Sequence, residues 1–349
     1  MPPTIEDLRT GTDHERVMRA RDPGAGYDAI IAVHSTAAGR AVGGTRLWRY
    51  DSFDDALTDA LRLSRGMTFK CLMARVPLGG GKSVILRGPD PIDRVGLLEA
   101  HGEAIEALGG IYSTGEDVGT TPDDMAILAR RTRWVAGLPG KSGDPSPWTA
   151  RGVLAALDAC AEFHWGKAAL DGRTVALQGC GAVGAPLARL MSARGARLIL
   201  CDVDPARARG LAGELGAEVV NPDRIWDAQA DVVAPCALGG VLNEDTIPRL
   251  KCSIVAGSAN NQLATPEDGM RLFARGIRYA VDYVANAGGL LSGCGEMLAC
   301  SRQQTEEGIA GIGRTMSAVL DASGRLGIPE SEAADRLALE RLEAIRSSR

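Results

Sequence analysis

The pattern that most constrains the fold is a short apolar run, a glycine-rich turn and a helix, followed by a second apolar run. The apolar runs are typical of buried strands. The four parts are, in chain order, Thr174-Val-Ala-Leu177, Gly179-Cys-Gly-Ala-Val-Gly184, Ala182 to Arg194, and Arg197-Leu-Ile-Leu-Cys201. Together with later strands at Asp231–Ala234 and Cys252–Ala256, they predict a doubly wound sheet of parallel strands.

The glycine spacing GxGxxG at this place indicates a dinucleotide-binding turn. Gly179 would make the tight turn, and Gly181 would let the backbone approach a pyrophosphate at the helix N-terminus. Asp202 ends the second strand, where an acidic residue binds the adenosine ribose. Because a 2′-phosphate would meet this carboxylate, the sequence favours NAD over NADP; Asp204 adds to the repulsion and Arg207 opposes it. The alternative is a tight strand-to-helix turn that binds no ligand.

The composition excludes several other classes of protein. The chain has 349 residues and a formal net charge of −5, and only 4% of its residues are aromatic, which argues against nucleic-acid binding. No run approaches the ~20 apolar residues of a membrane span, and the N-terminus lacks a signal-peptide pattern. The eight cysteines form no CxxC pair and no zinc spacing, which predicts reduced, mostly buried thiols, a cytoplasmic location and no metal site.

The length of the chain predicts two domains. Residues 137–147 have the glycine- and proline-rich composition of a loop, so the first domain is expected over residues 1–147 and the second over residues 148–329. The C-terminal helix, about residues 330–349, is expected to pack back on the first domain. The overall fold class is therefore α/β, with the dinucleotide-binding domain second.

The first domain is itself expected to alternate strands and helices. Ala29–Val33 and Ser83–Leu86 have the pattern of strands, and helices are expected from Ser52 through Lys70, from about Ile92 to Leu108, and from Thr121. The glycine triplet before Lys82 is expected to mark a place where the backbone turns sharply or approaches a ligand, ahead of the strand. This alternation predicts a second α/β sheet.

Two lysines and an aspartate of the first domain are candidates for chemistry. Lys82 directly follows the triplet Gly79-Gly80-Gly81, at an expected turn-to-strand junction where little should crowd it, and Lys70 lies twelve residues before it. A lysine beside another cation in a dry cleft has a lowered pKa and can act as a base near neutral pH. Asp117 follows an expected strand and can relay protons or hold an ammonium group. The alternative for each is an ordinary solvent-exposed charge.

Eight motifs spread over the chain bear on these candidates. They are Gly43-Gly-Thr-Arg46, Arg65-Gly-Met-Thr-Phe-Lys70, Leu78-Gly-Gly-Gly-Lys82, Glu116-Asp-Val-Gly-Thr120, Pro145-Ser-Pro147, Ala234-Pro-Cys-Ala-Leu-Gly239, Ala256-Gly-Ser-Ala-Asn-Asn-Gln262 and Asp282-Tyr-Val-Ala-Asn-Ala-Gly-Gly289. In this combination and order, the chain resembles the glutamate/leucine/phenylalanine/valine dehydrogenases. The resemblance implies NAD-dependent oxidative deamination of an L-amino acid to a 2-oxo acid, reversible as reductive amination, in a homo-oligomer.

The resemblance also implies roles for individual residues. Lys70 would bind the substrate carboxylate with help from Asn261 and the backbone near Gly43, Lys82 would activate water, and Asp117 would shuttle protons and hold the amino group. The residues implied to bind the cofactor are Gly179, Gly181, Ala182, Val183, Gly184, Asp202, Cys236, Ala237, Ala259, Asn260 and Asn286.

The walls of the side-chain pocket are implied to be Val42, Gly115, Leu290 and Gly293. None of these can pair with a γ-carboxylate, so glutamate is expected to be rejected. Leucine-type members of the family carry Ala and Val where this chain has Gly115 and Gly293. The larger cavity favours an aromatic substrate, phenylalanine or tryptophan, over the alternative of a branched aliphatic one.

Three departures from the family pattern bear on the substrate. Asp144 stands where asparagine is usual, Arg75 lies between the two lysines, and Ser292-Gly-Cys-Gly-Glu296 replaces an apolar stretch. Two other functions remain open alternatives. A hydroxy-acid dehydrogenase would need a histidine base, and the four histidines lie in no suitable context; a non-catalytic NAD-binding regulator would not need both lysines and Asp117.

Overall fold

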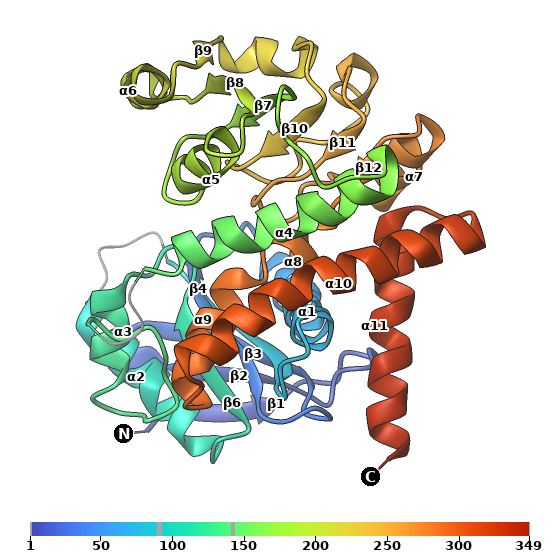
Figure 1. Ribbon diagram of the computed structural model, residues 1–349. Helices are drawn as coiled ribbons and strands as arrows, with labels where there is room; N and C mark the ends of the chain where they lie inside the picture. The colour runs from blue at the N-terminus through green and yellow to red at the C-terminus, as the bar shows by residue number, and fades with distance from the viewer. Residues whose placement is uncertain (1, 89–92, 141–143, 349) are drawn as a thin grey trace. The chain divides into compact units, whose positions relative to one another are not determined.

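The computed structural model describes residues 2–88, 93–140 and 144–348 (Figure 1). The chain forms two compact units. Unit 1 comprises Met1–Gly143, Glu296–Ala299 and Leu339–Arg349, and unit 2 comprises Asp144–Gly295 and Cys300–Ala338. The division lies four residues before the expected boundary at residue 147. The expected boundary loop includes residues 141–143, which lie outside the described residues.

Unit 1 is built on a mixed sheet of six strands in the order β1-β2-β3-β5-β4-β6. Their bounds are β1 Thr4–Asp7, β2 Arg16–Asp22, β3 Tyr27–Ser35, β4 Ala41–Trp48, β5 Gly79–Leu86 and β6 Tyr112–Glu116. β3 pairs antiparallel with β5, whereas β4 lies parallel between β5 and β6. The two strands expected from the apolar runs are confirmed as parts of β3 and β5, and the strand expected before Asp117 is confirmed as β6.

Helices cover both faces of this sheet. Ala56 and Ala60 of α1 (Phe53–Met73) pack with Ile30 of β3, whereas Leu97 of α2 (Arg94–Ala107) packs with the adjacent Ile31. Because neighbouring residues of a strand point to opposite faces, α1 and α2 lie on opposite faces of the sheet. The expected start of the second of these helices at Ile92 lies outside the described residues.

The ends of two helices follow the local sequence as expected. Ser52 Oγ accepts the amide hydrogen of Asp55 at 3.1 Å, so it caps α1. Thr121 and Asp124 form a capping box at the start of α3 (Pro122–Leu128), with Pro122 in its first turn. α1 continues past Lys70, which lies in its last turn.

The glycine triplet before Lys82 is not a turn but the first part of β5. A Cβ atom on Gly80 would lie 2.0 Å from the backbone nitrogen of Thr68 in α1, and one on Gly81 would lie 2.7 Å from the ring of Tyr112. Glycine is needed because a helix and an aromatic ring approach the strand from opposite faces. The expected uncrowded junction for Lys82 is therefore wrong: Lys82 lies within β5, and its side chain is 6% exposed.

Unit 2 contains the predicted parallel sheet, with strands in the order β12-β11-β10-β7-β8-β9. All its strand pairs are parallel. The strands are β7 Thr174–Gln178, β8 Arg197–Cys201, β9 Glu218–Val219, β10 Val232–Pro235, β11 Ile254–Val255 and β12 Arg278–Tyr279, with helices α5 Gly184–Ser192, α6 Pro205–Leu215 and α7 Pro266–Ala274. The order reverses on either side of β7, so the doubly wound prediction is confirmed and β7 marks the switch point at which such sheets bind ligands.

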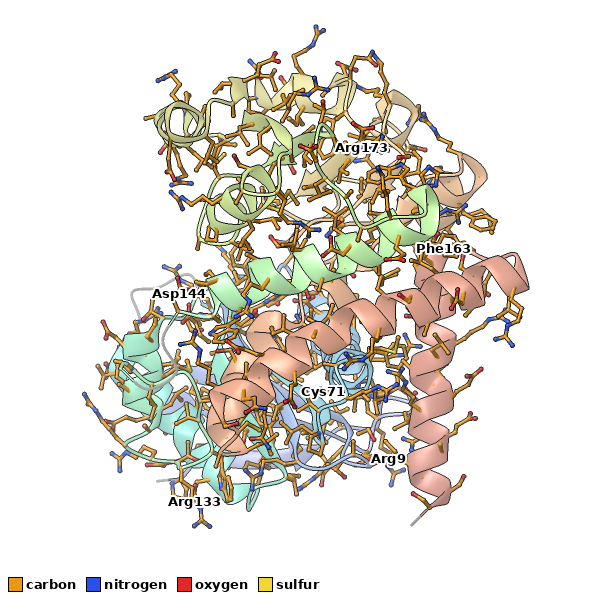
Figure 2. All side chains as sticks on the ribbon, viewed as in Figure 1. Arg9, Cys71, Arg133, Asp144, Phe163 and Arg173 are labelled. Atoms are coloured by element: carbon orange, nitrogen blue, oxygen red, sulfur yellow. The ribbon has the colours of Figure 1, made fainter. Side chains whose placement is uncertain are left out.

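The remaining helices of the chain are α4 Ser146–Trp165, α8 Asp282–Ala285, α9 Gly288–Met297, α10 Arg302–Leu326 and α11 Glu330–Ser347. α4 and α10 run alongside each other in unit 2 (Figure 1). Asp144, labelled in Figure 2, accepts the amide hydrogen of Ser146 at 2.8 Å, so this departure from the family pattern helps to start α4. No helix in the described ranges is long and apolar enough to cross a membrane.

The C-terminal helix α11 is shared between the units along its length. Residues 330–338 belong to unit 2, and Leu339–Arg349 belong to unit 1. In unit 1, Arg341 donates to the carbonyl of Leu72 at 3.1 Å, and Leu342 is buried against Ala37 and Leu72. Only the last part of the helix therefore packs on unit 1.

Candidate active site

A buried ion pair joins two of the candidate residues in unit 1. Lys82 Nζ of β5 lies 2.7 Å from Asp117 Oδ2, just after β6. The Lys82 side chain is 6% exposed and that of Asp117 is 23% exposed, so the aspartate is the partner that solvent or a ligand can reach. The amide of Asp117 donates to Thr120 Oγ1 at 3.0 Å, which fixes the loop that carries the carboxylate.

The surroundings of this pair shift both of its pKa values. Burial lowers the pKa of Lys82, Asp117 opposes this effect, and the Arg46 guanidinium adds to it, so the pKa lies below its ordinary value. Burial acts to raise the pKa of Asp117, but Lys82 and Arg46 outweigh it and hold the pKa below the ordinary value. Asp117 is thus an anion at neutral pH, and Lys82 loses its proton more readily than a lysine in water, as a general base requires.

A second cation holds the same carboxylate oxygen. Arg46 of β4 donates from Nε to Asp117 Oδ2 at 2.9 Å and from Nη1 to Asp59 Oδ2 of α1 at 2.7 Å. Asp59 also accepts from the hydroxyl of Tyr50 at 2.6 Å. Lys82 and Asp117 are therefore one end of a charged network that crosses from β5 to α1.

The other candidates of unit 1 lie on β4, β6 and α1. Gly43 packs tightly, because a Cβ atom there would lie 1.8 Å from the carbonyl oxygen of Gly81; its own carbonyl accepts from Tyr112 Oη at 2.8 Å. A Cβ atom would fit at Gly115, because the atom nearest to it would be a backbone carbonyl oxygen at 3.7 Å. Val42 is only 3% exposed, so it presents little surface to a ligand. Lys70 is partly buried in α1.

In unit 2, the glycine-rich turn has the geometry that a dinucleotide needs. Gly179 has φ +94°, and a Cβ atom there would lie 2.9 Å from the carbonyl oxygen of Cys236. A Cβ atom on Gly184 would lie 1.8 Å from the Gly179 carbonyl oxygen. A Cβ atom on Gly181 would have nothing within 4 Å, so that the backbone is open to a ligand at the second glycine. Ala182 is exposed and Val183 partly buried beside it.

Asp202 lies at the carboxyl end of β8 and faces this turn. Its Oδ2 accepts the amide hydrogen of Cys180 at 2.7 Å, and its Oδ1 accepts that of Asp204 at 2.8 Å. Arg207 lies 3.5 Å from Asp202 and 3.8 Å from Asp204. Arg207 is therefore already paired with two carboxylates. Burial acts to raise the pKa of Asp202, but the two amide donors and Arg207 keep it below its ordinary value.

The remaining candidates of unit 2 follow the carboxyl ends of β10 and β11. Cys236 and Ala237 pack against Gly179, and the Gly240 amide donates to the carbonyl of Asn261 at 2.8 Å. Asn261 is exposed and has φ +50°, a conformation that asparagine tolerates better than most residues.

An asparagine pair lies nearby. Asn286 donates from Nδ2 to Asn260 Oδ1 at 2.7 Å, while its own Oδ1 is buried without a hydrogen bond within the described chain. Ala259 is buried beside this pair, at 4% exposure. Leu290 and Gly293 lie on α9, and a Cβ atom on Gly293 would have nothing within 4 Å.

Comparison with known proteins agrees with this arrangement. The family model described as "Glu/Leu/Phe/Val dehydrogenase, dimerisation domain" matches residues 14–134, and that of the Glutamate/Leucine/Phenylalanine/Valine dehydrogenases matches residues 207–342. A leucine dehydrogenase of Thermoactinomyces intermedius is 44% identical over 99% of this chain and 95% of its own length. An L-tryptophan dehydrogenase of Nostoc punctiforme is 41% identical over 96% of this chain and 95% of its own length. The chain belongs to the glutamate/leucine/phenylalanine/valine dehydrogenase family.

A solved structure supports the same relationship. The crystal structure of L-tryptophan dehydrogenase from Nostoc punctiforme superposes with a TM-score of 0.87 and 39% identity, over 96% of this chain and 97% of that one. Membership of the family makes the chain an amino-acid dehydrogenase that depends on a nicotinamide dinucleotide.

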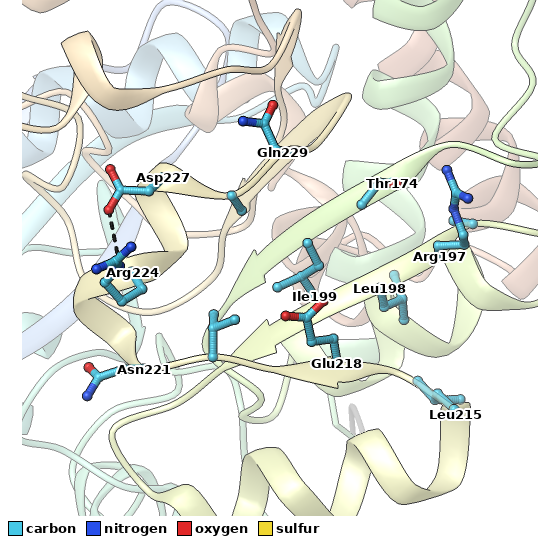
Figure 3. A pocket seen from close by; sticks show the side chains of 14 residues that line it. Thr174, Arg197, Leu198, Ile199, Leu215, Glu218, Asn221, Arg224, Asp227 and Gln229 are labelled. Carbon is cyan, nitrogen blue, oxygen red and sulfur yellow. Dashed lines mark ion pairs between the residues drawn. The ribbon is translucent and has the colours of Figure 1, made fainter.

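One hollow of unit 2 lies away from the candidate dinucleotide-binding turn. It has a volume of about 920 Å³ and includes Thr174 and Arg197, the first residues of β7 and β8, together with Glu218 of β9 (Figure 3). The glycine turn and Asp202 lie at the opposite, carboxyl ends of those strands. This hollow is therefore not part of the candidate dinucleotide site.

The structure also places the cysteines and the two remaining departures from the family pattern. All eight cysteines are free thiols, and six of them are buried, as expected. Arg75 is exposed with φ +57° in the turn after α1. Ser292–Glu296 lies in α9, and the side chain of Glu296 is outside the described residues.

Sequence reasoning missed the functional position of Arg46. The residue stands in the family motif Gly43-Gly-Thr-Arg46, which was the available signal, but its partners Asp59 and Asp117 are 13 and 71 residues away. Asp59 carries no motif of its own.

Proposed function

We propose that this chain catalyses the reversible NAD-dependent oxidative deamination of a hydrophobic L-amino acid to a 2-oxo acid and ammonium. The observation that carries the proposal is the buried pair of Lys82 and Asp117, at 2.7 Å, in a member of an amino-acid dehydrogenase family. A non-catalytic regulator would have no need of a buried lysine with a lowered pKa.

The cofactor would bind at the carboxyl ends of β7, β8 and β10. Gly181 leaves its backbone open to the pyrophosphate, Asp202 carries the charge that meets the ribose, and Asn286 Oδ1 can accept a hydrogen bond from a carboxamide. A nicotinamide cofactor held by these residues would supply the acceptor for the hydride of the substrate Cα. Because Arg207 is already paired with Asp202 and Asp204, the local charge favours NAD over NADP.

The residues of unit 1 supply the proton transfers. Loss of hydride from Cα leaves a substrate iminium, which water must attack. Lys82, as the free amine, takes a proton from that water, and the hydroxyl bonds to the former Cα. Asp117, the more exposed partner, holds the substrate ammonium, takes one of its protons before the hydride leaves, and returns that proton to the nitrogen once the hydroxyl has added. Ammonia then leaves as the carbonyl forms and takes up the hydroxyl proton, and Lys82 releases its proton to solvent. Lys70 and Asn261 bind the substrate carboxylate.

We infer an aromatic preference from two glycines. Gly115 and Gly293 each have room for a Cβ atom within their own units, so neither wall is filled where related enzymes carry larger residues. A small aliphatic side chain would leave that space empty at ~1 kcal/mol for each missing methylene contact. Val42 contributes little surface, which leaves the two glycines and Leu290 to set the preference. A branched-chain substrate is the second candidate, favoured by the 44% identity to a leucine dehydrogenase.

The substrate is tested by initial rates of NADH formation with L-Phe, L-Trp, L-Leu, L-Val, L-Glu and 2-hydroxy acids under one condition. We expect activity with the hydrophobic amino acids, a higher kcat/KM for Phe or Trp, and none with glutamate or the hydroxy acids. A tenfold advantage of Leu or Val would contradict the aromatic preference. The variant Gly293→Val should move preference towards the smaller side chains, and an unchanged preference would remove Gly293 from the pocket.

We also propose that the chain works as a homo-oligomer, at least a dimer. The support is the family model for residues 14–134, which describes a dimerisation domain. Sedimentation as a monomer at working concentration would contradict this.

A further inference from the structure

Two cations share one oxygen of the candidate catalytic carboxylate. Asp117 Oδ2 receives Lys82 Nζ at 2.7 Å and Arg46 Nε at 2.9 Å. None of the hydrogen bonds to this side chain in the described chain involves Oδ1. The carboxylate is thus held at one oxygen, while the other is left to meet a substrate ammonium.

The arginine is itself fixed from behind. Arg46 Nη1 donates to Asp59 Oδ2 at 2.7 Å, and Asp59 is held by Tyr50 Oη at 2.6 Å and Arg62 Nη2 at 3.0 Å. The side chains of Arg46 and Asp59 are only 18% and 15% exposed. A planar guanidinium that bridges two carboxylates has little freedom to rotate, so the position of Asp59 determines that of Asp117 Oδ2.

The sheet explains why these residues meet. Arg46 pairs in register with Val84, and Val84 is two residues after Lys82, so Arg46 and Lys82 point to the same face. That face is covered by α1, which carries Asp59. The residue types and the topology together build the network, although Asp59 lies in no motif of the family.

We propose that Arg46 and Asp59 are positioning residues that hold the carboxylate of Asp117 in place beside Lys82. The inference rests on the proposed role of Lys82 as the base. Neither residue touches the reacting atoms; Asp59 acts through Arg46, and Arg46 acts through Asp117.

The two residues act on Lys82 in opposite directions. The charged groups around Lys82 are Asp117 from the loop after β6, Arg46 from β4 and Asp59 from α1; Lys70 lies in the last turn of that helix, and Glu116 ends β6. Beyond burial and Asp117, the positive Arg46 lowers the pKa of Lys82 and the negative Asp59 raises it. Replacing one or the other should therefore move the pH dependence of catalysis in opposite senses.

The surroundings allow both substitutions. Arg46, Tyr50, Asp59, Arg62, Trp48 and Val118 border a surface hollow of about 440 Å³. A shortened side chain at position 46 or 59 is therefore replaced by water and does not leave a sealed void.

The test is the pH profile of kcat for oxidative deamination, in which the rate rises as Lys82 loses its proton. In Arg46→Gln this rise should shift to higher pH by ~1 unit, and in Asp59→Asn it should shift to lower pH. Arg46→Gln should also lower the plateau kcat, because Asp117 is no longer held. Arg46→Lys keeps the charge and should restore the position of the rise, but not the full plateau.

The control is Arg94→Gln, which breaks an arginine–carboxylate pair with Asp124 elsewhere in unit 1. It should lower thermal stability and leave the pH profile in place. NADH binding and the unfolding temperature confirm that each variant is folded; if Arg46→Gln does not fold, Asp59→Asn and Arg46→Lys carry the test.

Unshifted profiles, or shifts of Arg46→Gln and Asp59→Asn in the same direction, would overturn the positioning role. That result would leave the proposed function intact if Lys82→Ala is inactive. A fully active Lys82→Ala would instead remove the proposed function itself.

Discussion

Asp202 is the residue at which cofactor choice can be tested alone. Its carboxylate bonds the amide of Cys180 within the glycine turn and lies 3.5 Å from Arg207. Asp202→Ser should weaken NAD binding and relieve the repulsion of NADP, because Arg207 would lose one of its two carboxylate partners and could pair with a 2′-phosphate. The measurement is kcat/KM for both cofactors in the two proteins. A wild-type enzyme that prefers NADP would contradict the proposed role of Asp202 in cofactor choice.

At the same scale, residue types predicted part of the site and missed another part. Lys82 and Asp117 became candidates because a glycine-flanked lysine and an aspartate after a strand suit proton transfer and because both lie in motifs of the family. The structure places them 2.7 Å apart, and their catalytic roles stay a prediction. Arg46 was missed because its role depends on partners far away in sequence. The burial of Val42 was missed for the same reason, since packing across β4 and β5 is invisible in the local sequence.

The contact between β5 and α1 is the element-scale feature that places the lysines. Gly80→Ala would bring a Cβ atom to 2.0 Å from the Thr68 nitrogen, so strand and helix must separate. We expect a loss of about 2–3 kcal/mol in the free energy of unfolding, with reduced kcat/KM. Gly66→Ala is the matched control: it lies within α1 with nothing within 4 Å of a Cβ atom, so it should gain about 0.5–1 kcal/mol. Chemical denaturation measures the free energy of unfolding of both variants. Equal stability of the two would count against a close contact between β5 and α1 at Gly80.

The buried His101 of α2 predicts that the folded protein loses stability at acidic pH. His101 of α2 is fully buried, with Nδ1 2.8 Å from Tyr27 Oη and Nε2 3.0 Å from Thr45 Oγ1, and burial lowers its pKa to about 3. Below pH 6.5 the unfolded chain binds a proton that the folded chain does not, so stability falls with pH by about 1.4 kcal/mol per unit for this group.

The variant His101→Gln tests the direction of this change in stability with pH. Its unfolding free energy should fall by about 2 kcal/mol less than that of the wild type between pH 7 and pH 5. His14 and His34, whose pKa values burial also lowers, keep part of the slope in both proteins. Identical pH dependence in the two proteins would exclude His101 as the source.

Local sequence predicted some elements better than others for a physical reason. β7 and β8 follow from short apolar runs because strands buried on both faces of a parallel sheet need them. β1, β2 and β4 were not predicted: Thr4–Asp7 is almost wholly polar, Arg16–Asp22 is half charged, and Gly43-Gly44 interrupts Ala41–Trp48. Their strand conformation depends on pairing with other strands, neighbouring ones for β1 and β2 and distant ones for β4.

For the whole molecule, the sequence predicted two α/β units and the division near residue 147, which the structure has at residue 143. It did not predict that α11 is divided between them, because only tertiary contacts such as that of Arg341 with Leu72 distinguish the two parts of the helix. Family membership, by contrast, follows from motifs spread over the entire chain.

The claim that a buried lysine drives the reaction is tested most directly by kcat of Lys82→Ala with the preferred amino acid. Removing the base should lower kcat by ~10²-fold or more, while NADH binding, which we assign to residues of unit 2, stays unchanged. Lys70→Ala is the contrasting variant and should mainly raise KM, because it removes a charge-assisted contact to the substrate carboxylate. A Lys82→Ala enzyme that keeps close to wild-type kcat would contradict the account.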